Sequence, residues 1–304
     1  MRILVIGKNG QLGRSIEKIV NTDNKKGKNQ ILNDFIFVGR EDLDLSIEGS
    51  ISNFFDNNDK FNIIVNCAAY TQVDKAEKEV KLANQINNLA VKQLSKIANE
   101  QQSRLIHIST DYVFDGESNR PYLETDIPNP INVYGQTKLA GEKALQAVMP
   151  TNGIIIRTSW VYSEYGKNFV STMLRLGRER DELSVVSDQI GSPTNAADLA
   201  DVILEIINNK EFREEDQTTQ IYNYSNKGET SWYEFALEIF KITKIDCKVN
   251  PIKTLQYSTP AKRPRNTSMK TDRIINRFKI NNCVIWNISL RNHFKYLTQC
   301  DTNQ

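Results

Sequence analysis

The sequence is poor in the residues that build disulfide-linked or zinc-bound folds. It has 4 cysteines and 2 histidines among 304 residues. The cysteines show no C-x-x-C spacing and no neighbouring histidine, so neither a disulfide scaffold nor a zinc site is indicated; they are Cys67, Cys247, Cys283 and Cys300. Cys67 lies in an apolar segment and is expected to be a buried thiol in a reducing compartment.

Long apolar runs and an excess of one charge are also missing. No stretch approaches the roughly eighteen apolar residues of a membrane span, and the start, MRILVIGKNG, is too short in apolar residues for a secretory signal. Lys and Arg number 39 against 37 Asp and Glu, a net charge of +2, which offers no basic stripe for nucleic acid. We therefore expect a cytoplasmic globular protein with neither a membrane nor a nucleic-acid partner.

Short apolar runs recur through the first 160 residues. They are RILVIG, FIFVG, FNIIVNCAA, RLIHIST and GIIIRTSW. Most are apolar on both faces, as buried parallel strands are, and amphipathic segments such as KLANQINNLAVKQLSKIANEQ lie between them. The alternation predicts an α/β fold with a Rossmann-like, doubly wound parallel sheet over residues 1–160.

The alternation of short apolar runs and amphipathic segments becomes less regular after residue 160. NFVSTMLRLGRER and NAADLADVILEIINN are typical of helices, and SWYEFALEIFKIT begins at Ser231 with Glu234 completing a capping box. TPAKRPRNTSMKTDRI is a loop that leads into a helix. We expect residues 161–304 to form mainly a smaller substrate-binding lobe over the carboxyl edge of the sheet, with some segments returning to the sheet.

Three glycines follow the first predicted strand at the spacing GxxGxxG. Gly7, Gly10 and Gly13 open a helix at the start of a β-α-β unit. Glycines let the backbone approach a pyrophosphate, and the helix N-terminus offers free N–H groups. Gln11 and Leu12 lie on the same turn. A plain strand–helix turn is the alternative, but the context favours an NAD(P) site.

The second strand ends in FVGREDLDLS. Arg40 stands where an NAD-preferring fold usually has an acid, and a guanidinium there suits a 2′-phosphate. This favours NADPH, with NADH as the alternative, because Glu41 and Asp42 follow at once and Arg40 could equally stack on adenine. Asp44 and Leu45 are expected at the adenine end.

The third strand gives VNCAAYTQVDKAE. Ala68 and Ala69 are small enough for a cofactor to lie against the backbone, although close strand–helix packing would need the same residues. Tyr70 follows them directly, and all three are predicted to belong to the cofactor site.

The stretch NVYGQTKLAGEKAL sets Tyr134 and Lys138 four residues apart, on one face of a helix. An ordinary phenol, with a pKa near 10, is a poor acid at neutral pH. A nearby ammonium lowers that pKa, and its remaining protons can bind a ribose. The pair therefore suits carbonyl reduction, in which the phenol protonates the oxygen as hydride reaches the carbon.

A third polar group is predicted at the end of RLIHISTDYVFDG. Ser109, Thr110 and Asp111 lie at a carboxyl end, where such folds bind ligands, and the Thr110 hydroxyl can donate to a carbonyl oxygen. His107 is the rival for a catalytic role, but a packed core histidine is the better interpretation. His293 has no evident partner, and no GxSxG elbow supports a hydrolase.

The glycine triplet, the Ser-Thr strand end and YxxxK, in this order, resemble the extended short-chain dehydrogenase/reductases. The blocks GKNGQLG, VNCAAYTQVDKAE, STDYVFDG, RTSWVYSEYGKNFVSTMLRL, DQIGSPT and RPRNTSM, from residue 7 to about residue 273, are similar to those of the dTDP-4-dehydrorhamnose reductase family. The resemblance implies NAD(P)H-dependent reduction at C4 of a 4-keto-6-deoxy sugar nucleotide, the last step of dTDP-L-rhamnose synthesis.

The resemblance also implies roles for single residues. Tyr134 would be the proton donor and Lys138 its tuning partner, while Thr110 and Asp111 would contact the sugar ring. Trp160 would line the sugar pocket, with a core-edge aromatic as the alternative. From the C-terminal lobe, Arg263 and Asn266 would reach the diphosphate, with a basic surface loop as the alternative.

The resemblance leaves several points open. Some family members dimerise around a magnesium ion, but no acidic cluster can be placed here, so no metal ligand is predicted and both monomer and homodimer remain. NTSMKTD replaces the more usual NSRL pattern. The alternatives are a reductase of another 4-keto-6-deoxy nucleotide sugar, or a non-catalytic NADP-binding regulatory subunit of the methionine adenosyltransferase type; the intact Thr110, Tyr134 and Lys138 set favours an enzyme.

Overall fold

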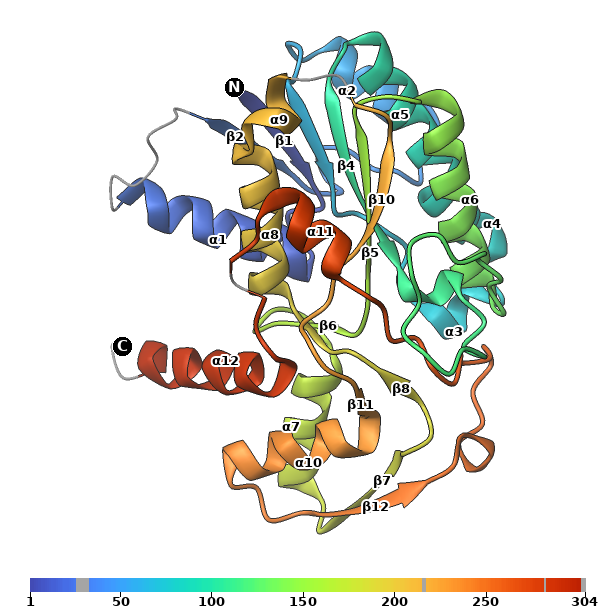
Figure 1. Cartoon of the computed structure of the whole chain (residues 1–304), viewed down its shortest axis with the longest axis vertical. Coiled ribbons are helices and arrows are strands. Elements are labelled where there is room, and N and C mark those ends of the chain that lie inside the picture. The colour runs from blue at the N-terminus through green and yellow to red at the C-terminus, as the bar shows by residue number, and fades with distance from the viewer. Residues whose placement is uncertain (26–32, 215–216, 282, 302–304) are drawn as a thin grey trace.

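A six-stranded parallel sheet forms the centre of the computed structural model, which describes residues 1–25, 33–214, 217–281 and 283–301 (Figure 1). The strand order is β10-β5-β4-β3-β1-β2, and every neighbouring pair is parallel. The strands are β1 (Arg2–Ile6), β2 (Asp34–Val38), β3 (Ile63–Asn66), β4 (Arg104–Thr110), β5 (Gly153–Thr158) and β10 (Gln220–Asn223). The predicted Rossmann-like doubly wound sheet is confirmed, and its order reverses between β1 and β3, where such sheets bind ligands.

Helices cover both faces of the sheet because successive strand residues point to opposite sides. Ile3 and Val5 of β1 pack into the cluster formed with α1, α8 and α11. Leu4 and Ile6 pack into the cluster formed with α2, α5 and α6. These helices are α1 (Gln11–Lys25), α2 (Ser50–Asp56), α5 (Ala90–Glu100), α6 (Val133–Val148), α8 (Ala196–Asn208) and α11 (Asp272–Phe278). None of the described helices is both long and apolar enough to cross a bilayer.

The long helical pattern predicted around residues 80–100 forms with an irregular middle. It divides into α4 (Val80–Asn84), a π-helical turn η1 (Gln85–Leu89) and α5. Asn87 in the turn accepts a hydrogen bond from Tyr70 N at 2.9 Å and donates to Tyr70 O at 3.1 Å. The π turn thus fixes the chain that follows β3, between that strand and α3 (Val73–Ala76).

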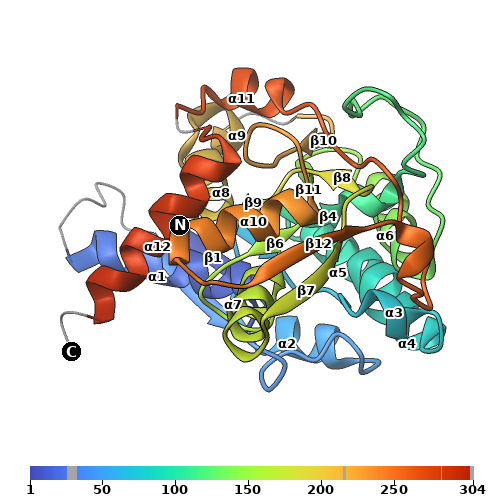
Figure 2. The ribbon, with the colours of Figure 1, turned by 90° about the horizontal axis from the view of Figure 1, so that it is seen from below.

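The smaller lobe lies below the carboxyl ends of the strands in Figure 1 and faces the viewer in Figure 2. It consists of α7 (Phe169–Glu179), α10 (Trp232–Thr243), α12 (Trp286–Asp301) and the strand pairs β7 (Glu182–Val186) with β12 (Lys248–Ile252), β8 (Ile190–Gly191) with β11 (Thr230–Ser231) and β6 (Val161–Tyr162) with β9 (Thr194–Asn195). The predicted capping box at Ser231 is present. The short helices η2 (Asp111–Val113), α9 (Lys210–Glu214) and η3 (Thr254–Gln256) complete the described elements.

Four of the described elements after residue 160 belong to the Rossmann half. Strand β10 pairs with β5, and helices α8, α9 and α11 pack on the same sheet face as α1. The chain therefore crosses between the two lobes several times after residue 160.

Candidate active site

A cleft of about 690 Å³ opens where the carboxyl ends of β1, β3, β4 and β5 meet the smaller lobe. Its lining includes Gly7, Ala68, Thr110, Tyr134, Lys138, Thr158, Trp160 and Trp232. Parallel strands bring these distant segments to one edge of the sheet. Most residues predicted for the cofactor site and all three predicted catalytic residues therefore lie along one cavity.

The glycine turn leaves its backbone bare at the switch between β1 and β3. Gly7 has φ +94°, and a Cβ added to it would lie 2.9 Å from Ala68 N. At Gly13 an added Cβ would lie 2.3 Å from Gly7 O. Larger residues are excluded, so a ligand can approach the turn and the first N–H groups of α1 directly. This cradle fits the pyrophosphate of a dinucleotide.

The Gln11 side chain connects this turn to the smaller lobe. Its Nε2 donates to Val161 O at 3.2 Å, and its Oε1 accepts from Ser163 Oγ and Asn168 Nδ2, both at 3.0 Å. The side chain is thereby committed to holding the two lobes together. Its backbone, with the buried Leu12 that also lines the cleft, remains the part that faces a cofactor.

The residues after β2 form a charged border at one end of the cleft. Lys8 Nζ lies 3.0 Å from Glu41 Oε1 and 2.8 Å from Asp42 Oδ2, and the hydrogen bond from Lys8 is the main reason that the pKa of Asp42 is lowered. Arg40 is largely exposed and lies 3.5 Å from Asp44 Oδ2. The two acids that follow Arg40 are thus paired with Lys8. The predicted residues that line the cleft here are Arg40, Asp44 and Leu45.

Behind β3, Ala68 and Ala69 line the cleft as predicted, but Tyr70 does not. The Tyr70 hydroxyl donates to Glu79 Oε2 at 2.8 Å, and its backbone is held by Asn87. Because the chain turns at this point into α3, the phenol is directed to the outer helices. The structure therefore does not bring the Tyr70 side chain to the cofactor site.

Helix α6 carries the predicted Tyr–Lys pair into the cleft. Asn132 caps the helix by accepting from Gly135 N at 2.8 Å, which fixes the first turn that contains Tyr134. Thr110, at the end of β4, forms a hydrogen bond with the Tyr134 hydroxyl. Thr110, Tyr134 and Lys138 all line the same part of the cavity.

The electrostatics of the pair differ from the sequence prediction. Burial raises the pKa of Tyr134 to about 12, against the hydrogen bond with Thr110, and burial lowers the pKa of Lys138 to about 8, against the charge of Glu142. Lys138 Nζ donates to Ile108 O at 2.6 Å. The ammonium therefore does not lower the phenol pKa in this structure, and the phenol remains protonated at neutral pH.

The Asp111 side chain is buried and lines the cleft next to Thr110. Burial raises its pKa to about 7. Its Oδ1 accepts from Thr110 Oγ1 at 3.0 Å, whereas its Oδ2 has no hydrogen-bond partner among the described residues. A buried, unpartnered oxygen in a cleft is suited to receive a hydroxyl of a ligand.

Two stacked indoles form the opposite, apolar side of the cavity. Trp160 has a backbone φ of +47°, and its ring lies 3.5 Å from the Trp232 ring at an interplanar angle of 8°. An added Cβ at Gly191 would lie 2.6 Å from the Trp160 ring. Trp160 lines the cleft, and its contact with a sugar stays a prediction. Trp232 was missed, because only the tertiary fold brings α10 to this position.

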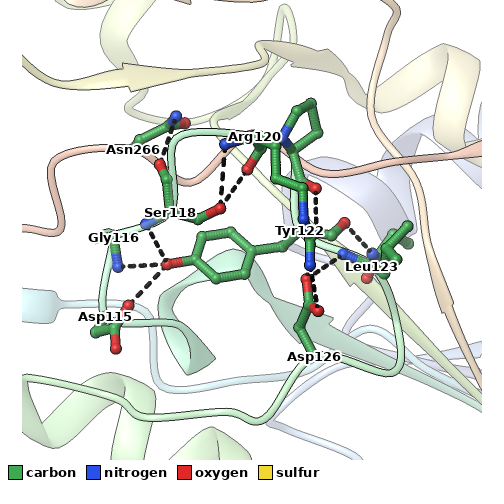
Figure 3. Close-up of polar contacts among 10 residues, drawn as sticks. Asp115, Gly116, Ser118, Arg120, Tyr122, Leu123, Asp126 and Asn266 are labelled. Carbon is green, nitrogen blue, oxygen red and sulfur yellow. Dashed lines mark hydrogen bonds and ion pairs between the residues drawn. The ribbon is translucent and has the colours of Figure 1, made fainter.

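The predicted diphosphate residues lie outside the cleft lining. Arg263 Nη2 lies 2.7 Å from Asp74 Oδ2, and its Nη1 donates to Ala261 O. Asn266 Nδ2 donates to Ser118 O at 3.2 Å (Figure 3). The loop that contains Ser118 is fixed in turn by the Tyr122 hydroxyl, which accepts from Ser118 N at 3.1 Å. Both side chains therefore fasten the C-terminal loop to the Rossmann half. Asn266 in particular is committed to this loop contact.

Lys167 is a cleft residue that the motifs did not predict. It follows Gly166, whose φ is +67°, and both line the cavity together with Gln11. The signal available in the sequence was a Gly-Lys-Asn stretch directly before a helix, because Asn168 caps α7. A cation beside the glycine turn adds positive charge where a pyrophosphate would bind.

No metal site emerges within the described part of the chain. Among those residues, no three His, Cys, Asp or Glu side chains gather closely enough to hold an ion. No step of the chemistry is assigned to a metal.

The chain is similar to known proteins along nearly its whole length. Residues 1–298 match the family model described as the RmlD substrate binding domain. The dTDP-4-dehydrorhamnose reductase of Aggregatibacter actinomycetemcomitans is 42% identical over 286 residues, which are 92% of this chain and 94% of that protein. The crystal structure of a dTDP-4-dehydrorhamnose reductase from Clostridium acetobutylicum has a TM-score of 0.88 at 40% identity, covering 98% of this chain and 100% of that one. The Bacillus anthracis dTDP-4-dehydrorhamnose reductase, solved in complex with NADP, has a TM-score of 0.87 at 35% identity, covering 97% and 99%.

Proposed function

The chain belongs to the dTDP-4-dehydrorhamnose reductase (RmlD) family of extended short-chain dehydrogenase/reductases, and we propose that it reduces the C4 ketone of dTDP-4-dehydro-L-rhamnose to give dTDP-L-rhamnose. Family membership makes it an NAD(P)-dependent oxidoreductase. The observation that carries the specific proposal is the meeting of Thr110, Tyr134 and Lys138 in the cleft that begins at the glycine turn.

The cofactor is NADPH in this proposal, and it supplies hydride to the ketone carbon. The backbone of Gly7, Gly10 and Gly13 and the first turn of α1 hold the pyrophosphate, with Lys167 contributing positive charge. Arg40 faces the 2′-phosphate. Pairing of Glu41 and Asp42 with Lys8 supports this choice, because it reduces repulsion of a phosphate dianion. The Bacillus anthracis relative binds NADP.

Proton transfer is assigned to Tyr134. The phenol carries its proton at neutral pH, and it is assigned to give that proton to the C4 oxygen as negative charge develops there. Thr110, whose hydroxyl donates to Asp111 Oδ1 in the structure, is assigned to turn this one proton to the C4 oxygen and orient it. One Lys138 proton is directed to Ile108 O; the other two are assigned to the nicotinamide ribose and the phenol oxygen.

The sugar is placed between the polar and the apolar side of the cavity. Asp111 Oδ2 accepts a sugar hydroxyl, which gives this oxygen the partner it lacks within the described chain. The stacked Trp160 and Trp232 rings present an apolar surface to the ring face and the 6-deoxy methyl group. Arg263, paired with Asp74, is assigned to the diphosphate side of the nucleotide sugar.

The test is NADPH and NADH oxidation with dTDP-4-keto-6-deoxyglucose, with and without a 3,5-epimerase of the rhamnose pathway. Turnover that requires the epimerase, with dTDP-L-rhamnose as the product, supports the proposal. A different product stereochemistry would assign the chain to another 4-keto-6-deoxy nucleotide sugar. Cofactor binding without any oxidation would favour the non-catalytic regulatory role.

A further inference from the structure

A chain of buried polar groups runs from β3 to Lys138 and is not used by the reaction described above. Asn66, the last residue of β3, is 1% exposed and His107 of β4 is 0% exposed. The parallel register of the two strands places them side by side. The ring nitrogens of a histidine buried between strands cannot reach water, so the protein groups that face them decide which nitrogen carries the hydrogen.

The orientation of the Asn66 amide is fixed by the backbone. Ala68 N donates to Asn66 Oδ1 at 3.1 Å. The opposite flip would set the side-chain NH₂ against that N–H, two donors facing each other. Asn66 Nδ2 therefore faces His107 Nδ1, at 3.1 Å. Since Nδ2 can only donate, Nδ1 of His107 accepts.

This pattern decides the tautomer of His107. Burial and the nearby Lys138 charge hold its pKa well below the usual value, so the ring is neutral. A neutral imidazole carries one N–H, and with Nδ1 accepting, that hydrogen is on Nε2. His107 Nε2 lies 3.4 Å from Lys138 Nζ. The ring hydrogen is thus aimed at the lysine nitrogen.

We propose that His107 is a positioning residue, locked as its Nε2–H tautomer by Ala68 and Asn66, and that its N–H makes the Lys138 ammonium a readier proton donor. An N–H aimed at an ammonium is repelled, whereas the same N–H forms a hydrogen bond with the lone pair of the amine. The proposed function gives this its catalytic meaning: once Tyr134 has given its proton to the C4 oxygen, Lys138 can pass one to the phenolate and regain it from solvent.

Other charges near Lys138 act in known directions. Glu142 on α6 favours the ammonium, but its carboxylate is shared with Arg157 from β5 at 2.6 Å. Tyr134 on α6 is protonated at neutral pH, and Asp111 after β4 titrates at about 7. Among these groups His107 is the one whose hydrogen opposes the charged lysine at close range.

The first test reads the tautomer by NMR, without turnover. The chain has 2 histidines, so a His293→Asn variant assigns the ¹⁵N signals of both. In the unmodified full-length protein at neutral pH, we expect His107 to show a protonated Nε2 and a bare Nδ1. A protonated Nδ1, or a doubly protonated ring, would overturn the proposal.

The second test changes the hydrogen-bond direction. In Asn66→Asp the carboxylate accepts from both Ala68 N and the ring, which moves the ring hydrogen to Nδ1 and makes Nε2 an acceptor for the ammonium. His107→Leu removes the hydrogen without adding a charge. In both variants we expect the Lys138 titration, followed by its ¹³Cε shift and assigned with Lys138→Met, to move upward by at least about half a pH unit.

The high-pH limb of kcat should move in the same direction in both variants. A Lys138 titration that stays at the unmodified value, or moves down, in both variants would contradict the proposal. Failure of the proposed function is a separate result, since it would abolish turnover of the unmodified protein while leaving the tautomer and the lysine titration as described.

Discussion

Arg157 of β5 and Glu142 of α6 form a buried ion pair beside the end of β4. Arg157 Nη2 lies 2.6 Å from Glu142 Oε2, and the two side chains are 2% and 1% exposed. Ser109 Oγ donates to the other carboxylate oxygen at 2.5 Å. The pair thereby ties β5 and β4 to α6, the helix that carries Tyr134 and Lys138.

Breaking this pair should cost much of the stability of the fold. Glu142→Gln leaves the Arg157 charge buried without a counter-charge, and we expect the free energy of unfolding to fall by about 3–5 kcal/mol. Urea unfolding at neutral pH measures it. The control is Arg175→Ala, which removes an exposed pair with Glu179 and should change stability by less than about 1 kcal/mol. Equal losses in the two variants would refute the structural role of the buried pair.

Asp111 should make stability depend on pH. Its pKa is about 7 in the folded chain and about 3.9 when unfolded. Between these values the folded state keeps a proton that the unfolded state has lost, so the free energy of unfolding falls as pH rises from about 4 to about 7. The Asp111→Asn variant lacks this carboxyl group, so its free energy of unfolding should not show this fall.

Urea unfolding at pH 4.5 and pH 7.5 tests this. The stability of Asp111→Asn relative to the unmodified protein should be higher at pH 7.5 than at pH 4.5, by roughly 2–4 kcal/mol. A stability difference between the two proteins that is the same at both pH values would show that Asp111 has an ordinary pKa.

Lys8 should support the choice of NADPH. In Lys8→Ala, Glu41 and Asp42 lose the cation that pairs with them, and their charge then opposes a 2′-phosphate beside Arg40. We expect the KM for NADPH to rise about tenfold, with a smaller change for NADH. Arg40→Ala should act in the same direction, and Arg175→Ala is the remote control. Steady-state kinetics with both cofactors decide the matter; equal effects on both would remove Lys8 and Arg40 from cofactor selection.

Local sequence patterns predicted the sheet and the residues at its carboxyl edge well. Runs of Ile and Val identify buried strands, GxxGxxG and Ser109–Asp111 lie at strand ends, and YxxxK lies in the first turns of the helix that connects β4 to β5. Parallel strands bring such ends together, so the cleft follows from order along the chain. The Ser231 capping box is likewise local, and it is present.

Features that depend on tertiary contacts could not be predicted this way. Trp232 reaches Trp160 only through the packing of α10 on the smaller lobe. The π turn at Asn87 exists because its amide bonds the Tyr70 backbone, and the same arrangement turns Tyr70 away from the cleft. The pKa of Tyr134 reflects burial, which spacing in the sequence does not report.

In the proposed NADPH-dependent reduction, Tyr134 gives the proton to the C4 oxygen. The most direct measurement compares the unmodified protein with Tyr134→Phe, following NADPH oxidation with the epimerised 4-keto sugar nucleotide and NADPH binding by fluorescence. We expect the variant to bind NADPH normally and to lose at least about a hundredfold in kcat, because a positioned proton donor contributes about 10²–10⁴-fold. Near-normal turnover by Tyr134→Phe would show that Tyr134 is not the proton donor.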